Sequence, residues 1–377
     1  MNGRRIWAVA RKEGIHISRD WRSLVMGIAI PILLLILFGY ALTLDVDAVP
    51  LVVWDQSGTE TSRRFIGHFD GSSYFSLRRY VQTYAEVEQA IDEGSALAAL
   101  IVPTDFGPDL AAGRVARVQA ILDGSDSNTA TIVLGYVETV ARTYNRDLAI
   151  EQTARTSGRT VMVPLDLRPR VWFNADMESK NYIIPGLIAV IMMVIAAMLT
   201  SLTVAREWEA GTMEQVISTP LKGPELILGK LLPYFGIGLF DVLVAVLMGE
   251  FLFRVPLRGN VALLFSMAAV FLVGALALGM LISIVTKAQL LASQLAMVLT
   301  FLPAFLLSGF MYDISNMPDA IQAITHVVPA RYFVSLLKGI YLKGIGLELL
   351  MLEATLLAVF GLLVLLAANL VFKKKLV

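Results

Sequence analysis

Long apolar blocks alternate with short polar connections along most of this chain. Each of six blocks has the roughly 20 apolar residues that a helix needs to cross a bilayer. They lie at 24–44, 181–204, 226–253, 261–285, 290–310 and 347–372. The pattern predicts an α-helical integral membrane protein with about six transmembrane helices.

Residues 45–178 break this pattern, because charges, Gly and Ser become frequent and no apolar run is long enough to span. Alternating and short apolar runs predict strands at 49–54, 74–81, 97–102, 115–122 and 167–173. Helical patterns lie between them at 61–69, 85–93, 104–112 and 130–155. Strands alternating with helices predict an inserted α/β domain with a mixed sheet. It follows the first span, so we expect it to be extracytoplasmic.

Residues 1–23 are basic and aromatic. Ile6, Ala10, Ile17 and Trp21 recur at helical spacing, which predicts an amphipathic helix with Trp on its apolar side. Such a helix lies in the plane of the membrane interface. The alternative is the charged start of a signal peptide, but the apolar run 24–44 is long for one and no clear cleavage site follows it.

Charge placement orients the spans. Six cationic residues precede the first span, and Lys373–Lys375 follow the last, so both termini are expected in the cytoplasm. Lys230 is close enough to the inner face to extend its ammonium toward water. Residues 311–344 are interrupted by Pro318 and Pro329 and predict amphipathic or re-entrant helices at the outer interface.

Residues 205–222 form a charged connector between the second and third spans. Arg206, Glu207, Glu209 and Glu214 are costly in hydrocarbon, so we expect the connector to lie in water or among headgroups. Gly211 and Thr212 interrupt the helical pattern between these charges.

Composition supports a membrane protein and excludes several kinds of site. The 377 residues are 56% hydrophobic and 16% charged, and the net charge is +0, so no overall basic field indicates nucleic acid. The absence of Cys rules out disulfides and thiolate sites. His16, His68 and His326 have no metal-ligand spacing, so no metal site is expected.

Several motifs make the chain recognisable. They are the run Ala205-Arg-Glu-Trp-Glu-Ala-Gly-Thr-Met-Glu, then Ser218-Thr-Pro, Gly229-Lys-Leu-Leu-Pro-Tyr234, and Asn-Tyr-Ile-Ile-Pro-Gly at 181–186. With the closing segment 302–344, they make essentially the whole chain resemble permease subunits of type-2 ABC exporters. The resemblance is to the bacterial multidrug-type subgroup, which has a large extracytoplasmic domain between the first two spans.

The resemblance implies several partners. It implies separate ABC ATPase subunits that bind ATP and Mg²⁺, a second permease subunit that is identical or closely related, and a possible periplasmic adaptor. It further implies a bacterial inner-membrane location with residues 45–178 in the periplasm, and a drug-like or lipid-like substrate. The connector would receive the stroke of the ATPases, together with the N-terminal helix. Its candidate coupling residues are Arg206, Glu207, Glu209, Gly211, Thr212 and Glu214.

The chain is not expected to hydrolyse ATP. The nearest approach to a phosphate-binding loop runs from Gly223 to Lys230, with one residue too many between its glycines. Leu231 stands where a hydroxyl would hold magnesium. We therefore expect no catalytic residue and no cofactor in this chain.

Asp241, near the middle of the third span, is the polar candidate inside the membrane. It is either a proton or substrate contact or a hydrogen-bonded packing residue. If it carries protons, the chain could be a proton-coupled secondary transporter, although the paired internal repeats typical of that class are not seen. A third class is a membrane-anchored scaffold whose outer domain binds a partner.

Overall fold

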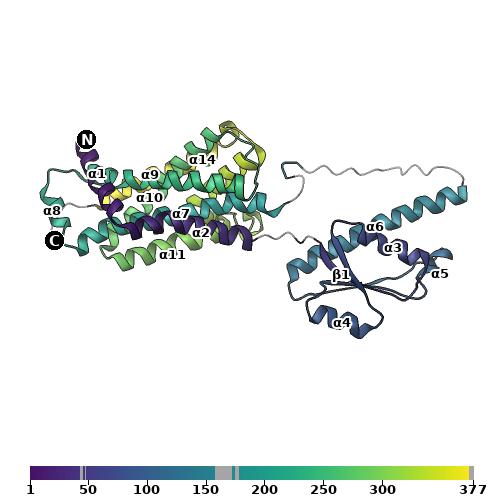
Figure 1. Cartoon of the computed structure of the whole chain (residues 1–377). Coiled ribbons are helices and arrows are strands. Elements are labelled where there is room, and N and C mark those ends of the chain that lie inside the picture. Colours follow the sequence, from purple (N-terminus) through teal and green to yellow (C-terminus); the bar gives the residue numbers. More distant parts are fainter. Residues whose placement is uncertain (43–45, 47, 158–171, 175–177, 373–377) are drawn as a thin grey trace. The chain divides into compact units, whose positions relative to one another are not determined.

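The computed structural model describes residues 1–42, 46, 48–157, 172–174 and 178–372, in two compact units (Figure 1). One unit comprises 1–43 and 170–377, and the other comprises 44–169. Most of the strand expected at 167–173 lies outside the described residues, and Trp172–Asn174 do not form a strand. Lys373–Lys375 also lie outside them.

The first unit is helical. Its longer helices are α1 (Gly3–Arg19), α2 (Trp21–Ala41), α7 (Ser179–Glu209), α9 (Gly223–Leu247), α10 (Val261–Thr286), α11 (Gln289–Leu307) and α14 (Met351–Val371). Its shorter elements are α8 (Met213–Ser218), η1 (Met248–Leu252), η2 (Ile314–Asn316), α12 (Asp319–Thr325), α13 (Pro329–Lys338), η3 (Gly339–Lys343) and η4 (Leu347–Leu349).

Five helices in the described part of the chain are long and apolar enough to cross a membrane, namely α7, α9 with η1, α10, α11 and α14. The bent pair of α12 and α13 with η3, angled at 85°, passes the same test when taken together. The expected first span is the helix α2, in which the apolar section Gly27–Ala41 is shorter than these five. The prediction of a helical membrane protein is therefore confirmed.

Contacts between the helices define two ends of this unit. The connector, α1 and the last described residue, Phe372, lie at one end, where Phe372 packs on Gly223. We call this the connector end; the start of α1 and helix α8 both lie at this end of the unit in Figure 1. At the other end, Gly39 packs against Phe253, and Tyr182 donates a hydrogen bond to the Gly309 carbonyl (3.1 Å).

The bent pair of α12 and α13 with η3 lies at this far end. Lys338 donates to the Gly309 carbonyl, near the end of α11 (2.8 Å), and Arg258 N donates to the Tyr341 carbonyl (3.1 Å). Gly344, which follows the pair, packs against Arg258 as well. The pair therefore enters and leaves at one end, as expected for re-entrant helices, and the described helices running end to end are α2, α7, α9, α10, α11 and α14.

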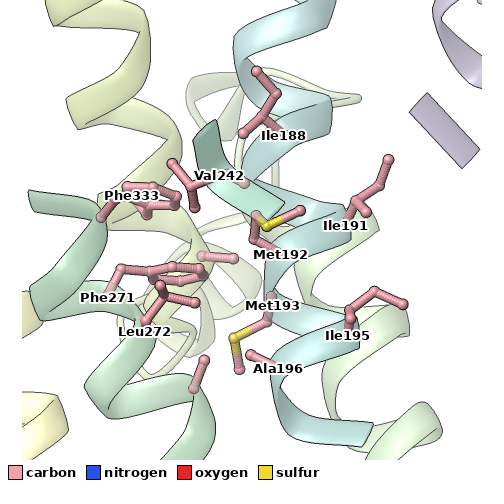
Figure 2. Close-up of a cluster of buried hydrophobic side chains, with 14 of the residues drawn as sticks. Ile188, Ile191, Met192, Met193, Ile195, Ala196, Val242, Phe271, Leu272 and Phe333 are labelled. Carbon is pink, nitrogen blue, oxygen red and sulfur yellow. The ribbon is translucent and has the colours of Figure 1, made fainter. Parts of the chain in front are cut away.

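Helix α7 is the centre of the helical unit. Nearly all of its side chains from Ile183 to Ala197 are buried, because α2, α9, α10, α11 and α13 all pack on it. Figure 2 shows Met192, Met193 and Ala196 of α7 beside Val242 of α9 and Leu272 of α10. Next to them, the rings of Phe271 and Phe333 stack 4.0 Å apart (Figure 2). A helix so completely covered is apolar all round, which explains its weak amphipathicity in the sequence.

The second unit contains a four-stranded sheet. Its strands are β1 (Val49–Asp55), β2 (Phe75–Tyr80), β3 (Ala98–Val102) and β4 (Gln119–Leu122), in the order β2-β1-β3-β4. β1 pairs in parallel with β2 and β3, whereas β4 is antiparallel to β3, so the sheet is mixed as expected. The helices are α3 (Glu60–Asp70), α4 (Tyr84–Asp92), α5 (Phe106–Ala111) and α6 (Ser127–Ser157). β4 is shorter than the strand expected at 115–122.

The central strands β1 and β3 are buried on both faces, which explains the continuous apolar run of β3, whereas the edge strands β2 and β4 are more exposed. Val49, Leu51 and Val53 face a core completed by Phe65 of α3 and Tyr144 of α6. Residues of opposite parity, such as Val52 and Ala99, face a smaller core that includes Val87 of α4. Successive side chains of these strands thus lie on opposite faces of the sheet, in two separate cores.

Candidate functional site at the connector end

The connector begins as a continuation of α7 rather than as a loop. The helix runs on to Glu209, and the chain then turns at Gly211, whose φ of +70° favours glycine. α8 follows, with Met213 fully buried, and the chain enters α9 after Pro220. The expectation that all the connector charges lie in water or headgroups is wrong for Glu207, which is 8% exposed and buried within the protein.

Helix α1 packs directly onto the first turns of α9. A Cβ atom on Gly229 would lie 2.6 Å from Val9 Cβ and 2.9 Å from the Ile6 carbonyl oxygen, so only glycine allows this approach. Packing buries Val9, Ala10, Glu13 and Ile17 of α1. The predicted amphipathic helix is present, but Trp7 lies 65% exposed and not on its buried side, and Trp21 belongs to α2.

The close approach places Lys230 among acidic side chains from two other helices. Its Nζ lies 3.1 Å from Glu13 Oε2 and 3.2 Å from Glu207 Oε1. Lys12 Nζ lies 2.9 Å from the same Glu207 oxygen, and the Tyr234 hydroxyl donates to Glu13 Oε1 (3.1 Å). We call these five residues the inner cluster. Its formal charges cancel, which lowers the free-energy cost of burying groups that would be costly to bury alone.

Lys230 was expected to extend toward water, and that expectation is wrong. The residue is 1% exposed, and its ammonium also lies 3.5 Å from the Thr203 carbonyl oxygen of α7. The inner cluster therefore ties α1, α7 and α9 together. One oxygen of this cluster, Glu207 Oε2, is buried without a hydrogen-bond partner in the described chain.

Three further contacts hold α1 at its ends. At the start, the backbone N–H of Asn2 donates to Glu225 Oε1 (2.8 Å), and the Arg5 guanidinium donates to the Pro220 carbonyl (2.8 Å). At the end, Arg206 of the connector pairs with Asp20 at 3.2 Å. Helix α1 is thus fixed to the connector and to α9 along its whole length.

The connector is also joined to the turn between α10 and α11. Glu209 accepts hydrogen bonds from the backbone and side-chain amides of Gln289, the backbone one at 2.8 Å. The Lys287 ammonium lies 4.6 Å from the centroid of the Trp208 ring. A displacement of the connector would therefore act on four transmembrane helices, since α7, α9, α10 and α11 all meet it.

The six predicted coupling residues thus occupy different positions. Arg206, Glu207 and Glu209 make the contacts described above. Thr212 donates to the Glu207 carbonyl (3.4 Å), and Gly211 forms the turn. Glu214 is exposed on α8.

Sequence reasoning missed Lys12, Glu13, Asp20 and Tyr234. Glu13 carried a usable signal, because it is the one acidic residue of a basic helix and lies four positions before the apolar Ile17. An acidic side chain within an apolar stripe indicates a buried partner. Nothing local identified that partner, since Lys230 is 217 residues away.

A cavity of about 360 Å³ adjoins the inner cluster. Its wall is mostly apolar and is formed by residues of α2, α7 and α11, among them Leu34, Val194, Met198 and Phe301. One end is polar and is lined by Lys12, Glu13, His16, Arg206, Glu207 and Lys230. A volume in this range is typical of pockets for small organic molecules.

Asp241 lies in α9, away from the inner cluster. It is 4% exposed, and no hydrogen bond or ion pair to it is found within the described residues. It lines a small void of about 10 Å³ together with Pro31 and Leu35 of α2. No described residue therefore supports the interpretation of Asp241 as a hydrogen-bonded packing residue. No described group of three or more His, Cys, Asp or Glu residues could hold a metal ion.

Comparisons with known proteins agree with this architecture. A family model described as "ABC-2 family transporter protein" matches residues 21–370. The "probable multidrug ABC transporter permease YbhS" of Escherichia coli is 38% identical over 345 residues, which cover 91% of this chain and 90% of that protein. The "probable multidrug ABC transporter permease YbhR" of E. coli is 29% identical, with 92% of each chain covered. The E. coli "inner membrane transport permease YhhJ" is 25% identical over 84% of this chain and 83% of its own length.

Proposed function

Because the chain belongs to the ABC-2 family of transporter proteins, we propose that it is the membrane-spanning permease subunit of an ATP-driven exporter. Separate ATPase subunits bind ATP and Mg²⁺ and supply the free energy. Two permease subunits, identical or closely related, form the transport path. The chain itself carries no catalytic residue.

One observation carries the coupling proposal: the connector is joined to the transmembrane helices by buried charges. Lys230 bridges Glu13 of α1 and Glu207 of α7 from its own position on α9. Breaking a buried ion pair costs about 3–5 kcal/mol, so these three helices resist separation. A force on the connector therefore moves them together rather than bending the connector alone.

In the proposed mechanism, closure of the ATPases on ATP pushes α8 and the exposed part of the connector. Glu214 is the candidate coupling residue best placed to contact an ATPase, because it is exposed on α8. The push reaches α9 and α7 through the inner cluster and reaches α11 through Glu209 and Gln289. Since α7, α9 and α11 contribute to the cavity, their tilt changes its access.

The cavity supports an amphipathic cargo. Its wall is apolar over most of its length and polar at one end, so a molecule with an apolar body and a polar head would match it. This fits drug-like or lipid-like substrates, and the names of the relatives YbhS and YbhR include the word "multidrug".

We place the protein in the bacterial inner membrane with its connector end in the cytoplasm. The first described residue and Phe372 lie at the same end as the connector, which agrees with both termini being cytoplasmic. The α/β unit is then periplasmic, where it could contact an adaptor protein.

A proton-coupled transporter remains the second candidate, because Asp241 is buried without an observed partner. The ATP-driven exporter and the proton-coupled transporter differ in their energy source, which is ATP hydrolysis for the first and a proton gradient for the second. A scaffold function gains no support from the connector, whose buried contacts would then have no role beyond stability.

The proposal is tested by purifying the full chain from native membranes and identifying the proteins that co-elute with it. An ATP-hydrolysing partner is expected, and its turnover should rise when an amphipathic substrate is added. Glu214→Lys should lower this stimulation without unfolding the permease, whereas Glu88→Lys, exposed on α4, is the matched control. Transport by the isolated chain without any nucleotide-hydrolysing partner would refute the proposal.

A further inference from the structure

Helix α1 presents a second face that the inner cluster does not use. Successive residues advance by about 100° around an α-helix, so Trp7, Arg11, Arg4 and Ile15 fall within an arc of about 80°. Arg19 lies close beside this arc. We call these five residues the outer face of α1.

The outer face is exposed and unpaired. Trp7 is 65% exposed and Ile15 is 43% exposed, and the three arginines are exposed as well. No ion pair involving Arg4, Arg11 or Arg19 is found in the described part of the chain. The single acidic residue of α1, Glu13, is buried on the opposite side against Lys230. The outer face is therefore a cationic surface interrupted by one aromatic and one aliphatic side chain.

The position of this face limits what can cover it. Helix α1 ends at Arg19 and the apolar helix α2 begins at Trp21, so the chain passes from α1 into a hydrocarbon-spanning segment within two residues. Contacts to α9 and the connector fix the opposite side of α1. The outer face is thus held at the level where lipid headgroups meet the acyl chains.

We propose that the outer face of α1 is a binding surface for anionic phospholipid headgroups. The arginines pair with phosphate groups, and Trp7 and Ile15 insert between the headgroups beside them. A cationic helix with Trp at the interface combines apolar insertion with attraction to anionic lipid. Each cationic residue near such a surface contributes attraction that salt weakens. This binding is separate from the proposed coupling to an ATPase and does not require one.

The surface can be tested by Trp fluorescence quenching in the full chain, reconstituted without other proteins into phospholipid nanodiscs. Brominated phosphatidylglycerol or brominated phosphatidylcholine is added at the same mole fraction. The signal of Trp7 is obtained by subtracting the signal of the Trp7→Phe variant. We expect brominated phosphatidylglycerol to quench Trp7 at least about twofold more strongly, and high salt should reduce the difference.

Matched variants assign the preference to the arginines. Replacing Arg4, Arg11 and Arg19 by Gln should make the two lipids quench Trp7 equally, whereas Arg78→Gln with Arg79→Gln, exposed on β2, should leave the preference unchanged. The thermal unfolding temperature checks that each variant is folded. Equal quenching in the unmodified chain would overturn the anionic preference. An absence of quenching by either lipid would show that the face contacts protein or water instead, and would overturn the proposal.

Discussion

Lys230 of α9 and Glu13 of α1 form an ion pair at 3.1 Å, although the two residues are 217 positions apart in the chain. Both side chains are almost completely buried, and Glu207 completes the arrangement from a third helix. The pair converts a surface helix, α1, into a fixed part of the transmembrane bundle. The following predictions test this arrangement and the cavity next to it.

Lys230→Met should strongly destabilise the helical unit. The substitution leaves the Glu13 and Glu207 carboxylates buried close to each other without their shared cation. Removing one partner of a buried ion pair costs about 3–5 kcal/mol. Thermal unfolding in detergent measures the effect, and Lys222→Met, at an exposed position, is the control. Equal unfolding temperatures for the two variants would show that the pair contributes little.

Asp20→Asn should have a much smaller effect. The Arg206–Asp20 pair is accessible to water, with about 30% of each side chain exposed. Accessible ion pairs contribute about 0–1 kcal/mol. The unfolding temperature should therefore fall slightly at low salt and match that of the unmodified protein at high salt. A loss as large as that of Lys230→Met would contradict this ranking.

Gly229→Val should displace α1 from α9. The added side chain meets Val9 and the Ile6 carbonyl at distances that no Cβ can occupy. Overpacking of this kind costs about 1–3 kcal/mol. The same substitution at Gly236, where a Cβ meets nothing within 4 Å, is the matched control on the same helix. Hydrogen exchange of the α1 backbone amides would report the separation of α1 from α9, and unchanged exchange in Gly229→Val would argue against the displacement.

Met198→Trp should reduce transport by filling the cavity. Met198 lines the apolar wall on α7, and the larger ring occupies part of the roughly 360 Å³. Substrate-stimulated ATP hydrolysis should fall several-fold while basal hydrolysis is retained. Val285→Trp, at an exposed position of α10, is the control for added bulk. Unchanged stimulation in Met198→Trp would place the cargo path elsewhere.

Asp241→Asn should leave ATP-driven transport intact. The substitution keeps the shape of the side chain and removes a titratable group that has no observed partner in the described chain, so stability should be unchanged or slightly higher. Transport by the variant is measured with and without a proton gradient. Complete loss of transport together with its proton dependence would favour the proton-coupled alternative.

The contrast between Trp7 and Glu13 illustrates where sequence reasoning about α1 reached its limit. Helical spacing predicted an amphipathic helix, and the helix is present. The predicted positions Ala10 and Ile17 are buried, but Glu13 was not included in the same face, because a hydrophobicity pattern assigns Glu to the solvent side. In the structure a cation on α9 makes burial of Glu13 favourable, and the interface leaves Trp7 exposed.

The sequence by itself determined the spans, the connector between α7 and α9, and the mixed character of the sheet in the α/β unit. These follow from local physics, since a run of about 20 apolar residues is most stable as a helix across a bilayer and alternation selects a strand. Only the tertiary structure decided the partners of Glu207 and Lys230 and the presence of a cavity beside them. Those partners depend on how closely α1 approaches Gly229, and that distance is set by packing between segments that lie far apart in the chain.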